Sequence, residues 1–123
     1  MKEKLFFRNS NEARFIDPSL ILYVIAYGRY SVFHLSTSVS FCLPMQLGKV
    51  SEIIARQLPH TCNDFARVGR SLIINLTYLH NILLLQGKLE LLDRNLDKVV
   101  LNASEASLKE LIDHLDSLIN INH

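Results

Sequence analysis

The spacing of hydrophobic positions predicts strands through the first third of the chain. Residues 20–27 form an unbroken apolar run rich in β-branched side chains, which predicts a strand buried on both faces. The dipeptide Gly28-Arg29 then forms a turn. Residues 30–35 and 39–43 are predicted to form a hairpin, because the polar residues 36–38 separate two apolar segments.

Alternation is clearest in the second strand of that hairpin. Val39, Phe41 and Leu43 occupy every second position, so we expect them on one face, and Pro44 ends the strand. Two shorter apolar pieces near the N-terminus predict another hairpin. It forms an extension over residues 1–17, with a turn of Asn and Ser between its strands.

The spacing of apolar residues becomes helical after Pro44. Leu47, Val50, Ile53, Ile54 and Leu58 recur at intervals of three and four, and Pro59 stops this internal helix.

This helix has two interpretations, a helix that reads DNA bases and a helix that packs on a sheet. Its polar face mixes both signs of charge and lacks a cluster of Asn, Gln and Arg for base edges, so we favour a helix that packs on a sheet.

The C-terminal part of the chain predicts a second hairpin and a longer helix. Residues 79–85 and 89–92 flank a Gly-containing turn, and residues 99–101 form a further strand. The best helical pattern in the chain spans 108–119, with either Asn102 and Glu105 or Ser104 at its start. The predicted fold class is therefore mainly β, an elongated arrangement of small antiparallel sheets and hairpins with one short internal helix and a C-terminal helix.

Composition indicates one globular domain. The chain has 123 residues, 49% hydrophobic and 20% charged, enough for a core. Its longest apolar run has eight residues, whereas a membrane span needs ~20. The N-terminus shows no signal-peptide pattern, so we expect a cytoplasmic protein without membrane insertion. In that compartment Cys42 and Cys62 are expected to be buried free thiols.

Charge is distributed unevenly. Residues 1–100 contain twelve Lys and Arg against eight Asp and Glu, whereas residues 101–123 contain Lys109 and four acidic residues. A mildly basic body with an acidic tail favours contact with DNA through the body alone.

Catalytic and metal-binding patterns are weak. His60 and Cys62 form one close-spaced pair, but a zinc site needs three or four converging ligands, so we expect no metal. The sequence contains no GxSxG elbow, phosphate-binding loop or dinucleotide fingerprint, which argues against an enzyme and against a cofactor.

Two predicted turns carry arginines instead. Arg29 lies beside Tyr30 at one turn, and Arg67, Gly69 and Arg70 lie at another. A guanidinium can hold a phosphate or donate to O6 and N7 of guanine, and it does so best from a rigid loop. The sequence therefore indicates recognition by loops.

The segment Phe65-Ala66-Arg67-Val68-Gly69-Arg70-Ser71-Leu72-Ile73-Ile74-Asn75 resembles the LytTR-type DNA-binding domain of bacterial response regulators, marked approximately by F-x-R-x-H-R-S-x-x-V-N. Phe65, Arg67, Arg70, Ser71 and Asn75 match. The strand and turn 23–30 resemble the family's A-x-G-x-Y pattern, and the similarity runs from about residue 18 to 115.

This resemblance implies binding of duplex DNA through loops that enter successive major grooves. It implies that Arg29 with Tyr30 forms the first contact and that Gly69 and Arg70 form the second. The third would lie near Ser104, Glu105 and Ala106, just before the last helix. It also implies target sites that are paired repeats, bound by a homodimer.

The remaining roles follow from the same resemblance. Arg67 and Ser71 would support the second loop or hold phosphate, and Asn75 would brace the backbone behind it. Gly69 stands where the family has histidine, and Glu105 stands where it has a basic residue.

The leading hypothesis is thus a sequence-specific transcriptional regulator in a stand-alone domain without a receiver. A sensor or receiver protein would supply its signal. The alternative is a protein-interaction module on the same fold with little DNA affinity, in which the acidic last helix docks a partner or a second copy.

Overall fold

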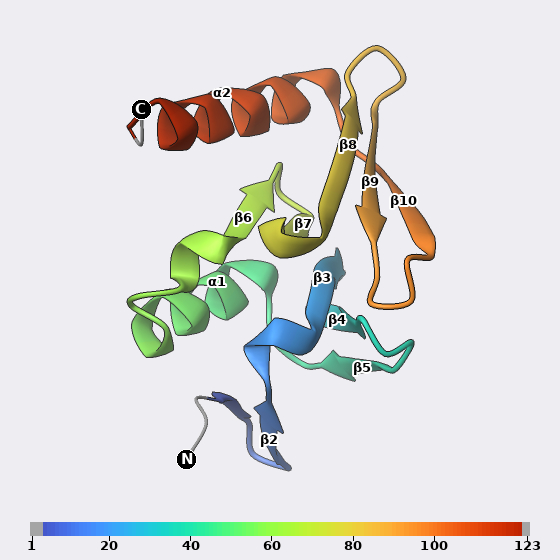
Figure 1. Ribbon diagram of the computed structural model, residues 1–123. Helices are drawn as coiled ribbons and strands as arrows, with labels where there is room; N and C mark the ends of the chain where they lie inside the picture. Colours follow the sequence, from blue (N-terminus) through green and yellow to red (C-terminus); the bar gives the residue numbers. More distant parts are fainter. Residues whose placement is uncertain (1–3, 122–123) are drawn as a thin grey trace.

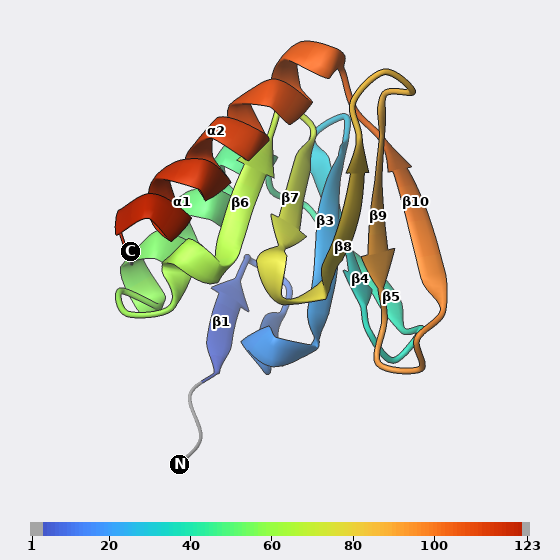
Figure 2. The ribbon, with the colours of Figure 1, turned by 45° about the horizontal axis from the view of Figure 1, so that its top comes forward.

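The structure, a computed structural model, describes residues 4–121. A five-stranded antiparallel sheet lies at its centre, in the order β5-β4-β3-β7-β6 (Figures 1 and 2). Its strands are β3 (Ile21–Tyr27), β4 (Tyr30–Leu35), β5 (Ser40–Leu43), β6 (Phe65–Val68) and β7 (Leu72–Asn75).

The middle strand of this sheet is the apolar run predicted from the sequence. Ile21 and Val24 of β3 belong to one hydrophobic core and Leu22 to another, which confirms burial on both faces. A register shift between Ile21 and Tyr23, where β3 pairs with β4, accompanies this arrangement. The sheet therefore separates two cores.

The first core lies between the sheet, helix α1 (Leu47–Gln57) and the hairpin formed by β1 (Leu5–Arg8) and β2 (Ala13–Ile16). Leu5 and Phe7 are fully buried in it. Gln57 fixes the hairpin to the end of α1, since its side-chain amide donates to the carbonyl of Phe6 and accepts from the Phe6 amide, both at 2.8 Å. The predicted N-terminal hairpin exists, and residues 1–3 of the predicted extension lie outside the described residues.

The second core lies on the other face. It is covered by a three-stranded sheet of β8 (Leu79–Leu83), β9 (Lys88–Leu92) and β10 (Lys98–Asn102), and by helix α2 (Glu105–Ile121). Leu89 and Leu91 of β9 and Leu108 of α2 are fully buried there. The prediction of a mainly β fold with small antiparallel sheets and two helices is confirmed.

Both helices use their apolar faces for packing. Leu47, Val50, Ile53 and Ile54 of α1 are buried against the sheet, so α1 is the packing helix that we favoured. The first half of α2 packs through Leu108 and Leu111 against Ala66 and Val68 of β6. These buried leucines are not available for docking a partner.

Two expectations about local structure were wrong. Val39 precedes β5, is 55% exposed and does not share the buried position of Leu43, because the turn after β4 extends to it. Cys42 is exposed, since it lies on the outward side of the short edge strand β5, and Cys62 is only half-buried in the 3-10 turn Cys62–Asp64. Both are free thiols.

Within residues 4–121, no helix has the length and apolar character required to cross a membrane.

Candidate nucleic-acid interface

The first candidate loop is a tight turn between β3 and β4. Tyr27 pairs with Tyr30, which leaves Gly28 and Arg29 as a two-residue connection. Gly28 has a φ of 60°, a conformation that glycine adopts at low cost in hairpin turns. Arg29 is exposed, and Tyr27 and Tyr30 are 76% and 49% exposed beside it. The turn therefore presents one guanidinium flanked by two aromatic rings.

The second candidate loop joins β6 to β7. Val68 pairs with Leu72, so Gly69, Arg70 and Ser71 form the connection, and all three are exposed. Arg67 lies within β6 and not in the turn, which corrects the prediction. Its guanidinium Nη2 donates to the carbonyl oxygen of Arg70 at 3.2 Å, so Arg67 spans the loop from the strand that leads into it.

These two turns lie at the same end of the central sheet. β3 and β7 are neighbouring antiparallel strands, so the end of one lies beside the start of the other. The amide of Ala26 donates to the carbonyl of Ser71 at 2.8 Å, which fixes the second turn beside the first. Figure 2 shows both turns at the top of the molecule.

The third candidate segment is the start of α2. Ser104 is the residue before the helix, and its Oγ accepts from the amide of Ser107 at 3.1 Å, so of the two predicted starts the structure has the N-cap at Ser104. Glu105 and Ala106 are not in a preceding loop but in the first turn of the helix. The difference arises because the Ser104 cap lets helical geometry begin at Glu105.

A close contact brings the second and third segments together. Gly69 has a φ of 64°, and a Cβ atom placed on it would lie 2.9 Å from Oγ of Ser107. The backbone of the β6–β7 turn therefore touches the first turn of α2. In this chain a side chain at position 69 would collide with Ser107, so glycine at that position is tied to the packing of α2.

The charges at this end are mainly positive. Among the described residues, the guanidinium groups of Arg29 and Arg70 have no hydrogen-bond or ion-pair partner. Glu105 forms an ion pair with Lys109 at 3.3 Å, with both side chains more than half exposed. Such an exposed pair contributes less than ~1 kcal/mol, but it places a cation beside the carboxylate.

Asn75 is the last residue of β7, at the end of the strand opposite the β6–β7 turn. Its side chain is buried, its Nδ2 donates to the carbonyl of Ile21 at 2.9 Å, and its Oδ1 accepts from the amide of Thr77 at 3.1 Å. These bonds link β7 to the start of β3 and shape the short 3-10 turn Leu76–Tyr78. Asn75 thus lies at the other end of β7 from the turn that presents Arg70, and it holds β7 against the start of β3.

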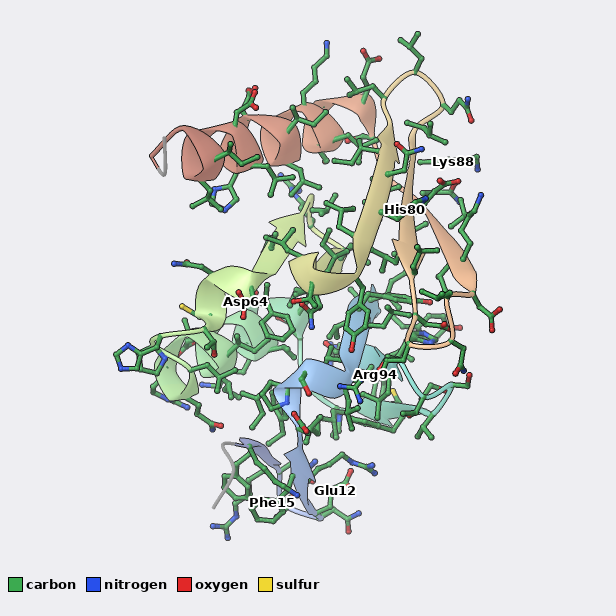
Figure 3. All side chains as sticks on the ribbon, in the orientation of Figure 1. Glu12, Phe15, Asp64, His80, Lys88 and Arg94 are labelled. Atoms are coloured by element: carbon green, nitrogen blue, oxygen red, sulfur yellow. The ribbon has the colours of Figure 1, made fainter. Side chains whose placement is uncertain are left out.

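A cavity of about 310 Å³ lies near Asn75, at the end of the sheet away from the candidate loops. Arg94, labelled in Figure 3, reaches it and makes 3.3 Å hydrogen bonds from Nε to the hydroxyl of Tyr78 and from Nη2 to Oγ of Ser19. The Tyr78 hydroxyl also donates to the carbonyl of Ser19. Arg94 is therefore engaged in holding the β9–β10 turn against the 3-10 turn Pro18–Leu20.

The histidines do not converge. Burial lowers the pKa of His34, whose ring stacks on Tyr23 with centroids 4.4 Å apart, and burial raises the pKa of Tyr23. His60 and His80 are exposed on other elements. Within residues 4–121, no three His, Cys, Asp or Glu side chains gather as metal ligands would.

Comparisons with known proteins show the family of the chain. The family model described as the LytTr DNA-binding domain matches residues 11–116. The chain therefore belongs to the LytTr DNA-binding domain family, and the DNA-binding class suggested by its loops is the class of its family.

Among solved structures, the chain is similar to the LytTr DNA-binding domain of a protein from Bacillus cereus described as a methyl-accepting/DNA response regulator. The TM-score is 0.63 at 16% sequence identity, over 94% of this chain and 98% of the other, which shows a shared fold. A search of curated proteins gave no match.

Proposed function

We propose that this chain is a transcriptional regulator that binds specific duplex DNA through the end of the molecule formed by the β3–β4 turn, the β6–β7 turn and the start of α2. Arg29 and Arg70 contact base edges in the major groove. Tyr30, Ser71 and Ser104 contact the sugar-phosphate backbone, which sets the position of the protein on the duplex. We also propose that the protein acts in the cytoplasm.

The observation that carries this proposal is the position of two unpartnered arginines on neighbouring turns. The bond from Ala26 to Ser71 and the bond from Arg67 to Arg70 restrict the turn that holds Arg70. An arginine on a restricted turn loses little conformational entropy when it forms two hydrogen bonds to guanine. Their position at one end of a rigid sheet suits a groove-binding surface.

The backbone at Gly69 adds to this surface. Because a side chain there would point at Ser107, glycine lets the turn that presents Arg70 pack directly against the first turn of α2. Glu105 is the one carboxylate among the proposed contacts. Its repulsion of phosphates is reduced by Lys109, and it can accept from N4 of cytosine.

We further infer that two copies bind paired repeats, and that a separate sensor or receiver protein supplies the signal. One short domain with three contact segments covers few base pairs. Two copies on one duplex double the number of base pairs that are contacted, which raises the specificity for the paired site.

Selection of the purified chain against random duplex DNA tests the proposal. We expect an enriched motif that occurs as two spaced copies, and binding that weakens steeply with salt because phosphate contacts release counterions. A folded protein that enriches no motif would contradict the proposal and favour a protein-interaction role.

A further inference from the structure

A fourth turn lies at the same end of the molecule and is not among the candidate contacts. It joins β8 to β9 over residues 84–87, between the paired residues Leu83 and Lys88. The amide of Gly87 donates to the carbonyl of Leu84 at 3.2 Å, which places Leu85 and Gln86 at the centre of a β-turn. Figure 1 shows this turn beyond the ends of β8 and β9, next to the start of α2.

This turn is anchored to the third candidate segment. The amide of Ala103, the residue before Ser104, donates to the carbonyl of Gly87 at 3.0 Å. Gly87 has a φ of 65°, and a Cβ atom on it would lie 3.1 Å from the carbonyl oxygen of Ala103. The two backbones are thus in direct contact, so the turn is held in place beside the N-cap of α2.

The side chains at its tip are free to reach outward. Leu85 is 93% exposed, the highest value among the large hydrophobic residues that the structure describes. Gln86 is also exposed, and the turn itself contains no acidic residue. An exposed leucine can contact the methyl group of thymine, and a glutamine can form paired hydrogen bonds to N6 and N7 of adenine.

The opposite end of the same small sheet offers a comparison. Leu96, in the turn between β9 and β10, is 75% exposed and has a φ of 64°. Its turn lies at the end that carries Arg94 and is turned away from the candidate loops (Figure 3). A similarly exposed leucine on the same sheet is therefore available as a matched control.

We propose that the β8–β9 turn is a further DNA contact, in which Leu85 and Gln86 read an A·T-containing step next to the bases contacted from the β6–β7 turn. This inference rests on the proposed function and adds a contact surface to it. The inference depends on the backbone contact between Gly87 and Ala103. This contact holds the β8–β9 turn beside Ser104, which is one of the proposed DNA contacts.

The test measures binding of the full chain to its selected duplex. Leu85→Ser and Gln86→Ala are compared with Leu96→Ser at one salt concentration, with unfolding midpoints as a check on folding. We expect each of the first two variants to bind roughly fivefold or more weakly and Leu96→Ser to bind as the unaltered chain does. A photo-crosslinking amino acid at position 85 should attach to the duplex, whereas one at position 96 should not.

The outcomes separate the two proposals. If the unaltered chain binds no duplex, the proposed function fails. If it binds, but Leu85→Ser and Gln86→Ala match Leu96→Ser, or position 85 gives no crosslink, the contribution of this turn is overturned while the proposed function stands. Weaker binding together with a crosslink from position 85 supports it.

Discussion

A Cβ atom on Gly69 would lie 2.9 Å from Oγ of Ser107, so the turn that presents Arg70 packs against the Ser107 side chain in the first turn of α2. Ser107 is held in this position, because Oγ of Ser104 donates to its Oγ at 2.8 Å and accepts from its amide. The candidate interface is therefore one packed unit and not a set of independent loops.

Gly69→Ala should destabilise the fold for two reasons. Alanine at a φ of 64° costs ~1–2 kcal/mol, and its methyl group would press on Ser107. Ser107→Ala should relieve only the second cost. Urea unfolding of both single variants and the double variant measures the unfolding free energies. We expect the double variant to lose less unfolding free energy than the two single variants lose together. Strict additivity would show that positions 69 and 107 do not interact.

Asn75→Ala should lower the free energy of unfolding by about 1–3 kcal/mol, because it leaves the buried carbonyl of Ile21 and the amide of Thr77 without their partners. Asn95→Ala, in an exposed turn, should stay within ~0.5 kcal/mol of the unaltered chain. Chemical denaturation distinguishes them. Equal stability of the two variants would mean that the Asn75 bonds do not hold β7 to β3.

The sequence predicted the elements better than their contacts. The unbroken run in β3, the N-cap at Ser104 and the hairpin around Gly87 follow from local spacing and turn chemistry, which a sequence displays directly. The exposure of Cys42 does not, because it depends on β5 being an edge strand. The contacts of Gly69 with Ser107 and of Gly87 with Ala103 join segments that only tertiary packing brings together.

Within the candidate site, the resemblance located the arginines but not their supports. The β3–β4 and β6–β7 turns could be expected to carry Arg29 and Arg70. The bond from Ala26 to Ser71 depends on the strand order of the sheet, in which β7 lies beside β3. In the chain, 44 residues (28–71) lie between the end of β3 and the start of β7. No local sequence pattern predicts that strand order.

Glu105→Gln should tighten DNA binding. Removing this carboxylate reduces repulsion of nearby phosphates, by up to ~1 kcal/mol, and we expect about two- to fivefold tighter binding at low salt that fades as salt rises. Glu52→Gln is the control, because Glu52 is an exposed helical glutamate that pairs with Lys49 on α1. Titrations of each variant with the selected duplex at two salt concentrations measure the difference in affinity. Weaker binding by Glu105→Gln would instead indicate that the carboxylate accepts a hydrogen bond from a base.

His34 should make stability depend on pH. Burial lowers its pKa below the ordinary 6.5, so the unfolded chain takes up a proton before the folded chain does. The stability associated with neutral His34 is present above about pH 6.5 and is lost as the pH falls.

His34→Phe keeps a ring to stack on Tyr23 but cannot be protonated. We expect its unfolding free energy to fall less than that of the unaltered chain between about pH 7 and about pH 5. Parallel curves for the two proteins would show that His34 is not responsible for the dependence.

The central claim is that Arg70 contacts bases from a turn held by Arg67 and Ser71. The most direct measurement compares Arg70→Ala with Arg56→Ala on the selected duplex. Arg56 is exposed in the last turn of α1, next to Gln57, which bonds to the N-terminal hairpin away from the candidate loops. Each variant removes one positive charge, so a difference between them reflects position and not net charge.

Equilibrium binding by fluorescence anisotropy at one salt concentration gives the result. We predict that Arg70→Ala loses ~1–3 kcal/mol of binding free energy, roughly five- to 150-fold in affinity, while Arg56→Ala stays within about twofold of the unaltered chain. Equal binding by the two variants, with both proteins folded, would contradict the account.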